Sequence, residues 1–232
     1  LSLHDALPIL YINHFFSGLL GYIYWFLVSK NLNEYQIGIN SNFINFITFI
    51  GFFSRLGMEY VIFSDLDIKN IEKNKTTISS INLIFYISNF TIIFFYLIIL
   101  YNFEIFQLNN LYSLLLFIIG AISWSFISLQ NAYFIKFRLF KFFIMRTILI
   151  SGTRIILIFL LDPGDVKIIN LIWVLTAVVG WIFGRFVLIK SIHFTFSFQL
   201  HKKSKLKEII RLSFSNLSFD FTEKKIKPPY IT

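Results

Sequence analysis

Arginines inside long apolar stretches are the residues of this chain best suited to bind a ligand. Arg154 lies near the middle of the stretch 142–161, and Arg55 and Arg185 lie toward the ends of two others. An arginine at the centre of a membrane helix costs at least ~2.5–3.5 kcal/mol, and 142–161 contains no carboxylate to pair with it. Facing a cavity, Arg154 could hold a diphosphate by charge-assisted hydrogen bonds; a bond to a neighbouring carbonyl is the structural alternative. Arg146 is assigned to the flanking loop.

Polar side chains form a stripe along each of two further apolar stretches. In 39–63 the spacing of four, three, seven and four residues puts the stripe on one helical face; its members are Ser41, Asn45, Thr48, Arg55 and Glu59. In 111–135 a similar stripe consists of Gly120, Trp124, Ser128 and Asn131. Because the hydrocarbon core holds no water, each stripe either lines a hydrophilic pathway or packs against another helix.

These patterns define two groups of candidate residues. The candidates for contact with a substrate head group are Arg154, Arg55 and Asn45. The candidates for a cavity or packing stripe are Thr48, Glu59, Ser128 and Asn131. Arg55 and Glu59 are four residues apart, so an ion pair within one helix is an alternative explanation for both.

Signatures of enzymatic chemistry are missing from the sequence. The chain has no Cys, which excludes disulfides, Cys-ligated zinc, iron–sulfur clusters and thiol nucleophiles. It also lacks HExxH, a glycine-rich phosphate loop and GxSxG. Asp162 and Asp165 flank a Pro-Gly pair, which predicts a surface turn rather than a metal site. We therefore expect no enzymatic activity, no catalytic or metal-binding residue and no cofactor.

The elements that must position these residues are membrane-spanning helices. Of the 232 residues, 56 % are hydrophobic and 14 % charged, against about 25 % charged in soluble domains, and the mean hydropathy is +0.72. Stretches long enough to span a bilayer are 10–28, 39–63, 80–101, 111–135, 142–161 and 168–189. They do not alternate at period two, so strands are not expected. The predicted fold is an all-α integral membrane bundle of six transmembrane helices, in which helices joined by short connections run antiparallel.

The distribution of Lys and Arg predicts the orientation of this bundle. The second, fourth and sixth connections carry 13 Lys and Arg, whereas the first, third and fifth carry two. Basic loops stay in the cytoplasm, so the N-terminus is expected to be cytoplasmic. This bias explains most of the net charge of +9 without a nucleic-acid partner. The run His201–Lys207 (HKKSKLK) either sets topology or contacts anionic membrane lipids.

The chain divides into three segments. Residues 1–9 (LSLHDALPI) look like the in-frame translation of a sequencing adapter and are set aside. Residues 10–190 form the expected six-helix lobe. Residues 191–232 are expected to form a basic cytoplasmic linker and the truncated start of a seventh helix, because the 11-residue segment Ile209–Phe219 is too short to span a bilayer.

Several short motifs resemble a known transporter family. Phe16–Phe63 contains a glycine-bearing helix, the link Ser29–Gly38 (SKNLNEYQIG) and the turn Leu56–Glu59 (LGME). Leu129–Phe142 is similar to a fourth-helix exit, and Glu208–Ser218 to the start of a seventh helix. Together these resemble polysaccharide flippases of the multidrug/oligosaccharidyl-lipid/polysaccharide exporter superfamily. The link departs from the family by placing Gln36-Ile37 between Tyr35 and Gly38.

The resemblance implies an N-terminal lobe whose C-terminal partner lobe is missing. Such proteins carry lipid-linked oligosaccharide across the cytoplasmic (inner) membrane by alternating access, which needs both six-helix lobes. The implied substrate is a polyprenyl-diphosphate-linked oligosaccharide for polysaccharide biosynthesis. The head-group candidates above come from membrane position and not from a family motif.

Two other functions remain open from the sequence. A drug or cation antiporter of the same superfamily would need carboxylates within the membrane, and none is clearly placed. A membrane-embedded polysaccharide polymerase would need a large extracytoplasmic loop, whereas the outer connections have about ten residues or fewer.

Overall fold

The structure, a computed structural model, describes all residues except 1–2, 69–70, 104–109, 162–163, 193–209 and 212–232. The described residues form helices and no strands, which confirms the all-α class. The helices are α1 (Leu3–Asn31), α2 (Glu34–Ser54), α3 (Met58–Asp65), α4 (Ile71–Phe103), α5 (Leu111–Lys136), α6 (Phe140–Leu161) and α7 (Val166–Ile192). The expected linker and seventh helix, 191–232, lie almost wholly outside the described residues.

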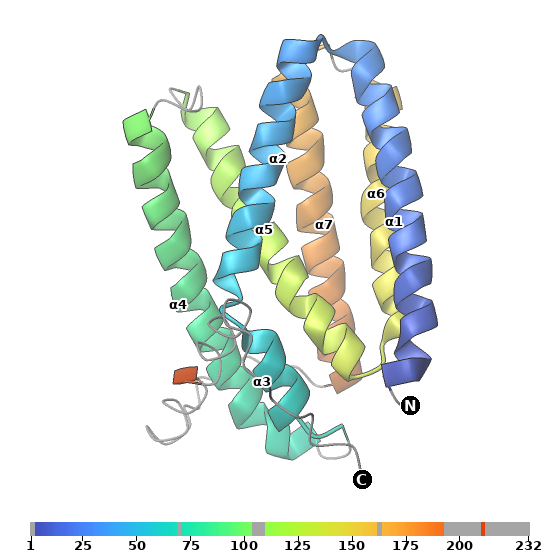
Figure 1. Cartoon of the computed structure of the whole chain (residues 1–232), viewed down its shortest axis with the longest axis vertical. Helices are drawn as coiled ribbons and strands as arrows, with labels where there is room; N and C mark the ends of the chain where they lie inside the picture. Colours follow the sequence, from blue (N-terminus) through green and yellow to red (C-terminus); the bar gives the residue numbers. More distant parts are fainter. Residues whose placement is uncertain (1–2, 69–70, 104–109, 162–163, 193–209, 212–232) are drawn as a thin grey trace, which may run out of the picture.

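The long helices run up and down side by side (Figure 1). The most extensive contact joins α5 to α7; α6 packs on α7 and α1, and α2 packs on α5. Helix α4 lies at the outer edge, where it meets α2, α3 and α5 with smaller contacts. The centre of the bundle is therefore formed by α5 and α7.

Close approach of the central helices depends on glycines. A Cβ atom at Gly120 of α5 would lie 2.7 Å from Ile47 Cδ1 of α2 and 3.1 Å from Val174 Cγ2 of α7. A Cβ at Gly180 of α7 would overlap Ile150 of α6. Small residues let membrane helices pack tightly, so Gly120 of the predicted stripe serves packing.

The predicted span 39–63 is not one helix, which corrects the sequence analysis. The helix is interrupted between α2 and α3, where Leu56 (φ 45°) and Gly57 (φ 71°) adopt left-handed conformations. Such a conformation ends a right-handed helix, and glycine adopts it without a Cβ penalty. The apolar composition continues across the break, so the hydropathy pattern alone did not indicate it.

The predicted connection Ser29–Gly38 is also mostly helical. Asn33 caps α2: its Oδ1 accepts from the Gln36 backbone N–H at 2.9 Å, and Gln36 Oε1 accepts from the Asn33 N–H at 3.1 Å. This reciprocal capping box stabilises a helix start. It gives Gln36, the departure from the family link, a structural role.

Among the described residues, five helical segments are long and apolar enough to cross a membrane, as expected of a multi-pass membrane protein. They are Glu34–Ser54, Asn74–Ile99, Leu111–Lys136, Phe140–Leu161 and Val166–Ile192. Large apolar side chains such as Phe159 and Leu160 are about 70 % exposed (68 % and 72 %), which suits contact with lipid. The first predicted span, 10–28, lies in α1, which is not one of the five.

The turns from α3 to α4 and from α5 to α6 lie at the same end of the bundle as the N-terminus and the end of α7 (Figure 1). This end carries Lys136, Arg138, Lys141 and Lys190. The opposite end carries Lys30 at the end of α1 and Lys167 at the start of α7. Among the described residues, the positive charge therefore gathers at one end.

Candidate functional site

Arg154 of α6 is held by a hydrogen bond from Nε of its guanidinium to helix α7. Its Nε donates to Thr176 Oγ1 of α7 at 2.9 Å, and that hydroxyl donates to the Trp173 carbonyl at 2.9 Å. The Arg154 Nη2 atom is buried without a hydrogen-bond partner in the described part of the chain. A guanidinium has five N–H donors, so the described residues leave part of the donor capacity of Arg154 unused.

Two aromatic rings flank the Arg154 guanidinium. Its Cζ lies 4.8 Å from the ring centroid of Trp173 on α7 and 5.8 Å from that of Tyr24 on α1. Aromatic faces attract cations electrostatically, more strongly when water is excluded. The rings therefore help to stabilise the positive charge without neutralising it.

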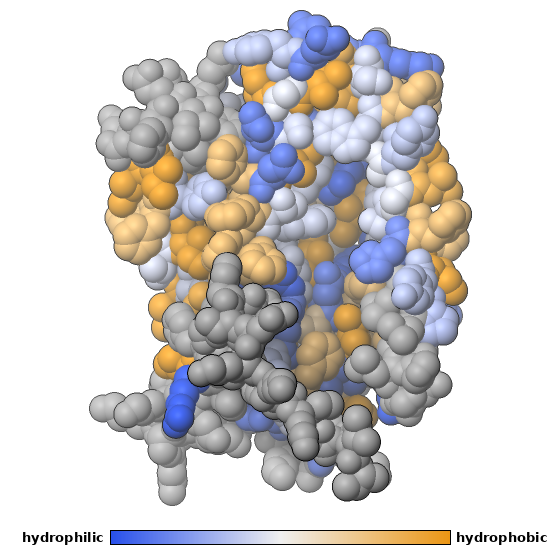
Figure 2. All heavy atoms as spheres, in the orientation of Figure 1, coloured by the Kyte–Doolittle hydropathy of each residue, from blue (hydrophilic) through white to orange (hydrophobic). Residues whose placement is uncertain are grey.

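A cavity of about 160 Å³ lies beside Arg154, between α1, α2, α5, α6 and α7. Its wall includes the hydroxyls of Thr48 and Ser151 and the indoles of Trp25, Trp124 and Trp173. Figure 2 shows hydrophilic residues along the strip between α2 and α1, with apolar residues on both flanks. The site therefore combines a cation, hydroxyls and aromatic faces within an apolar bundle.

Glycines make room for this wall. A Cβ at Gly51 of α2 would lie 2.9 Å from Trp124 Cδ1, so the absence of a side chain there admits the Trp124 indole. Gly21 of α1 lines the cavity and faces open space. Gly51 thus lets Trp124 approach α2, and Gly21 leaves space open on the α1 side of the cavity.

Of the predicted α2 stripe, Thr48 alone lines this cavity. Thr48 Oγ1 donates within its own helix, to the carbonyls of Ile44 and Asn45. The Asn45 side chain is exposed, and its Nδ2 donates to Ser41 Oγ at 3.5 Å. Asn45 therefore lies on the same helix face as Thr48, outside the cavity wall.

Arg55 lies apart from Arg154, at the break between α2 and α3. It forms an ion pair with Glu59, and its Cζ lies 5.4 Å from the Phe52 ring centroid. Arg55 and Glu59 therefore form the ion pair that was the alternative explanation for both residues. The structure does not bring Arg55 into the Arg154 cavity.

Arg146 is a buried residue that the sequence analysis had placed in a loop. It is 2 % exposed and lies within α6, where its Nη1 donates to Gln130 Oε1 at 3.0 Å and its Nη2 donates to Asn131 Oδ1. The predicted stripe residue Asn131 therefore binds a neighbouring helix, while Ser128 is half-buried on α5. The signal for Arg146 was its position inside the apolar stretch 142–161.

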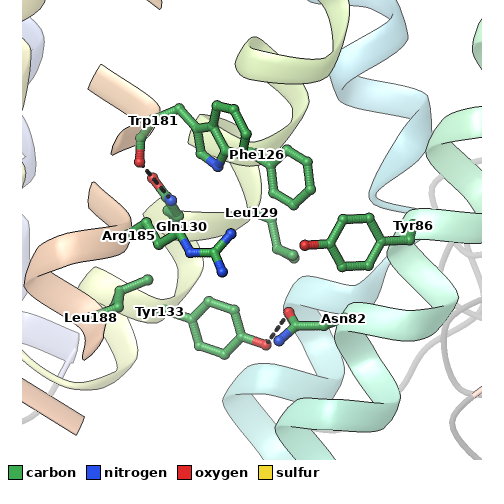
Figure 3. Close-up of a pocket in the computed structure, with 9 residues that line it drawn as sticks. All are labelled: Asn82, Tyr86, Phe126, Leu129, Gln130, Tyr133, Trp181, Arg185 and Leu188. Atoms are coloured by element: carbon green, nitrogen blue, oxygen red, sulfur yellow. Dashed lines mark hydrogen bonds between the residues drawn. The ribbon is translucent and has the colours of Figure 1, made fainter. Parts of the chain in front are cut away.

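A second, smaller cavity of about 20 Å³ lies between α4, α5 and α7 (Figure 3). Arg185, Asn82, Tyr86 and Tyr133 contribute its polar atoms, and the Tyr133 hydroxyl donates to Asn82 Oδ1 at 3.4 Å. Gln130 separates it from Arg146 and donates from Nε2 to the Trp181 carbonyl at 3.1 Å.

Helices α5, α6 and α7 contain three buried or half-buried arginines, Arg146, Arg154 and Arg185, and no Asp or Glu. Among the described residues, no group of three or more His, Cys, Asp or Glu could hold a metal ion. The chemistry of these helices is therefore that of cations, amides and hydroxyls, which suits binding of an anion.

No family model, no curated protein and no solved structure matches the chain. The similarity to polysaccharide flippases rests on the short sequence motifs. The site residues above are assigned from geometry and chemistry.

Proposed function

We propose that this chain is one six-helix lobe of a transporter that moves a polyprenyl-diphosphate-linked oligosaccharide across the cytoplasmic membrane. The observation that carries the proposal is Arg154, which lines the cavity between α1, α2, α5, α6 and α7 and whose Nη2 has no hydrogen-bond partner among the described residues. Guanidinium groups bind phosphate oxygens through two parallel hydrogen bonds. The diphosphate would bind at this guanidinium.

The rest of the cavity wall suits the sugar of the same substrate. Flat indole faces stack against sugar rings, and Trp25, Trp124 and Trp173 line the cavity. Thr48 and Ser151 add hydroxyls for hydrogen bonds. Drug-sized ligands occupy roughly 300–1,000 Å³, so a hollow of about 160 Å³ is the size of one wall of a larger site. A second lobe would complete it.

In this proposal the chain crosses the membrane six times with its N-terminus in the cytoplasm. The spans are α1, the broken pair α2–α3, α4, α5, α6 and α7. The gathering of Lys and Arg at the end that holds the N-terminus supports this orientation. The lipid tail of the substrate would remain in the bilayer beside the exposed apolar side chains.

Binding of a fluorescent polyprenyl diphosphate to the chain in lipid nanodiscs tests the proposal. Replacing Arg154 by Gln should weaken binding about 10- to 150-fold, because a hydrogen bond to a charged group contributes roughly 1.5–3 kcal/mol. Arg154→Lys should give an intermediate affinity, since lysine keeps the charge but lacks the planar fork. Lys167→Gln, at an exposed cation on the first turn of α7, is the matched control.

The expected ligand order is polyprenyl diphosphate above monophosphate, with the uncharged polyprenol weakest. Equal affinity of wild type and Arg154→Gln at the same folded fraction would refute a head-group role for Arg154. Binding of a lipophilic cation in preference to the diphosphate would instead favour a drug or cation antiporter.

A further inference from the structure

An apolar groove of about 350 Å³ lies along α4, beside the break between α2 and α3. Its walls are six residues of α4 between Leu83 and Ile92, together with Leu56 at the break and Ile210. Among the described residues, no charged side chain lines it, and its α4 wall falls within Asn74–Ile99, which is long and apolar enough to cross a membrane. The groove is therefore apolar surface at membrane depth, on other residues than the proposed head-group site.

One wall of the groove comes from the part of the chain that follows α7. The structure describes Ile210 and Arg211 beyond the end of α7, and both are helical. Figure 1 draws this pair beside α4, and Ile210 contributes to the groove. The chain therefore returns to α4 after it leaves α7.

The sequence that begins here has apolar residues at helical spacing. Ile210, Phe214 and Leu217 are four and three residues apart, so they would share one face of a helix that continues from Ile210. From Ile210 to Leu217 such a helix rises about 10 Å, and the groove extends about 14 Å along α4 from Leu83 to Ile92. The apolar face and the groove therefore match in length.

We propose that the groove on α4 is the docking site of the chain's own segment Ile210–Phe219, with Phe214 and Leu217 packed between α4 and Leu56. An apolar cavity of about 150 Å³ binds benzene, so the groove of about 350 Å³ has room for both side chains. A void forfeits the dispersion contacts of its lining. Filling it would strengthen the packing of α4, which makes smaller contacts than the central helices.

Ser88 of α4 favours a polypeptide over a lipid chain as the occupant. It lines the groove and is 7 % exposed, and its Oγ has no hydrogen-bond partner among the described residues. A hydrocarbon chain cannot bind a hydroxyl, whereas serine and asparagine side chains form hydrogen bonds between membrane helices. The proposed segment contains Ser213, Ser215, Asn216 and Ser218.

The course of the chain gives the direction of the segment in the groove. The end of α7 and the start of α4 lie at the same, basic end of the bundle (Figure 1). The segment therefore enters from that end and runs in the direction of α4. Seven residues separate Ile84 from Thr91 and Ile210 from Leu217, so Leu217 reaches the level of Thr91. This docking requires only the fold, and not the transport function proposed above.

Disulfide cross-linking in lipid nanodiscs tests the docking, because the chain contains no Cys. Thr91→Cys and Leu217→Cys are combined with a protease site introduced within residues 195–200. Oxidation should link the two cysteines, since Cα atoms up to about 7 Å apart can be bridged. The cleaved pieces should then separate on a gel only after reduction.

The matched control moves the α4 cysteine out of the groove. Phe90 is 60 % exposed on the same helix and does not line the groove. Phe90→Cys with Leu217→Cys should therefore cross-link with a yield several-fold below that of Thr91→Cys with Leu217→Cys.

Further variants keep the test decisive if Thr91→Cys does not fold. Ile87→Cys with Phe214→Cys should then form the cross-link, because Ile87 also lines the groove. Ser215→Pro interrupts a helix and should abolish the cross-link in either pair, whereas Ser215→Ala should retain it.

Four results would overturn the proposal. The first is equal cross-linking of Thr91→Cys and Phe90→Cys. The second is no cross-link in either groove pair, which would leave the groove to lipid chains. The third is a cross-link that survives Ser215→Pro. The fourth is equal cross-linking when Thr91→Cys and Leu217→Cys are on separate molecules, which would assign the groove to a second copy of the chain.

Discussion

Arg146 and Arg154 lie eight residues apart on α6 and are stabilised in different ways. Arg146 binds the amide oxygens of Gln130 and Asn131 and is 2 % exposed. Arg154 donates to one hydroxyl and lies close to two aromatic rings, and its Nη2 has no hydrogen-bond partner among the described residues. The hydrogen bonds of Arg146 therefore serve packing, whereas Arg154 is the residue for which we propose a ligand.

Gly184 provides the space for the Arg146 contact, and its replacement should be destabilising. In Gly184→Ala the new Cβ would lie 2.8 Å from Gln130 Cδ and 3.0 Å from Arg146 Nη1. We expect a loss of about 1–3 kcal/mol in the free energy of unfolding, the range for an overpacked core. Reversible unfolding in mixed SDS and mild-detergent micelles measures it.

Gly152→Ala is the matched control for this prediction. Gly152 lies in α6 and a Cβ there meets nothing within 4 Å. Alanine stabilises a helix interior by about 0.5–1 kcal/mol relative to glycine, so this variant should be unchanged or more stable. Similar losses at both positions would show that Gly184 has no special packing role.

The sequence indicated which arginine is a candidate for ligand binding, but not which contacts that arginine makes. Arg154 is singled out because its apolar stretch has no carboxylate, and in the structure it lines a cavity between five helices. Arg146 was missed because it was counted with the basic connection before α6, although it lies inside the predicted stretch 142–161. Asn45 and Arg55 belong to the predicted stripe, yet the break after α2 and the rotation of the helix keep both out of the cavity wall.

Helix α4 shows how one element combines satisfied and unsatisfied polar groups on its packing face. Asn74 and Asn89 are both 2 % exposed. Asn74 accepts from the Asp67 N–H at 2.9 Å and donates to the Asp67 carbonyl at 2.6 Å, so it caps the preceding loop. Asn89 Nδ2 has no hydrogen-bond partner within the described residues.

The two asparagines should therefore respond oppositely to the same substitution. Asn89→Leu removes a buried unsatisfied donor and should leave the free energy of unfolding unchanged or raise it. Asn74→Leu leaves the two Asp67 backbone groups without their partner and should lower it by about 1–3 kcal/mol. Unfolding of both variants in the same micelles provides the comparison. A large loss for Asn89→Leu would mean that Asn89 binds a group outside the described residues.

Long apolar windows predicted the elements well, and their ends poorly. Five of the six predicted spans overlap segments that can cross a membrane. The break at Leu56-Gly57 and the cap at Asn33 depend on single backbone conformations and side-chain bonds. Hydropathy averages over about 20 residues, so it does not resolve features of one to three residues.

At the scale of the whole molecule, the orientation of the bundle in the membrane can be tested by labelling single cysteines. The chain contains no Cys, so a single introduced Cys reports its own side of the membrane. A Cys at Lys141, exposed near the start of α6, should react with a membrane-impermeant maleimide only in inverted vesicles. A Cys at Lys167 should react in intact cells.

The wild-type chain is the control for this labelling, because it should not react from either side. The expected contrast follows from the positive-inside rule, which places the basic end in the cytoplasm. The reverse labelling pattern would show that the bundle has the opposite orientation in the membrane. Labelling of both positions from one side would show that α6 does not span the membrane.

The carboxylate-free composition of α5, α6 and α7 has an electrical consequence. Three guanidinium groups inside the bundle are positive charges with no negative counterpart on the same helices. Moving one such charge through the whole membrane potential changes the free energy by about 2.3 kcal/mol per 100 mV. Any tilt of these helices within a membrane would carry charge through the field. The membrane voltage would then favour one tilt over the other.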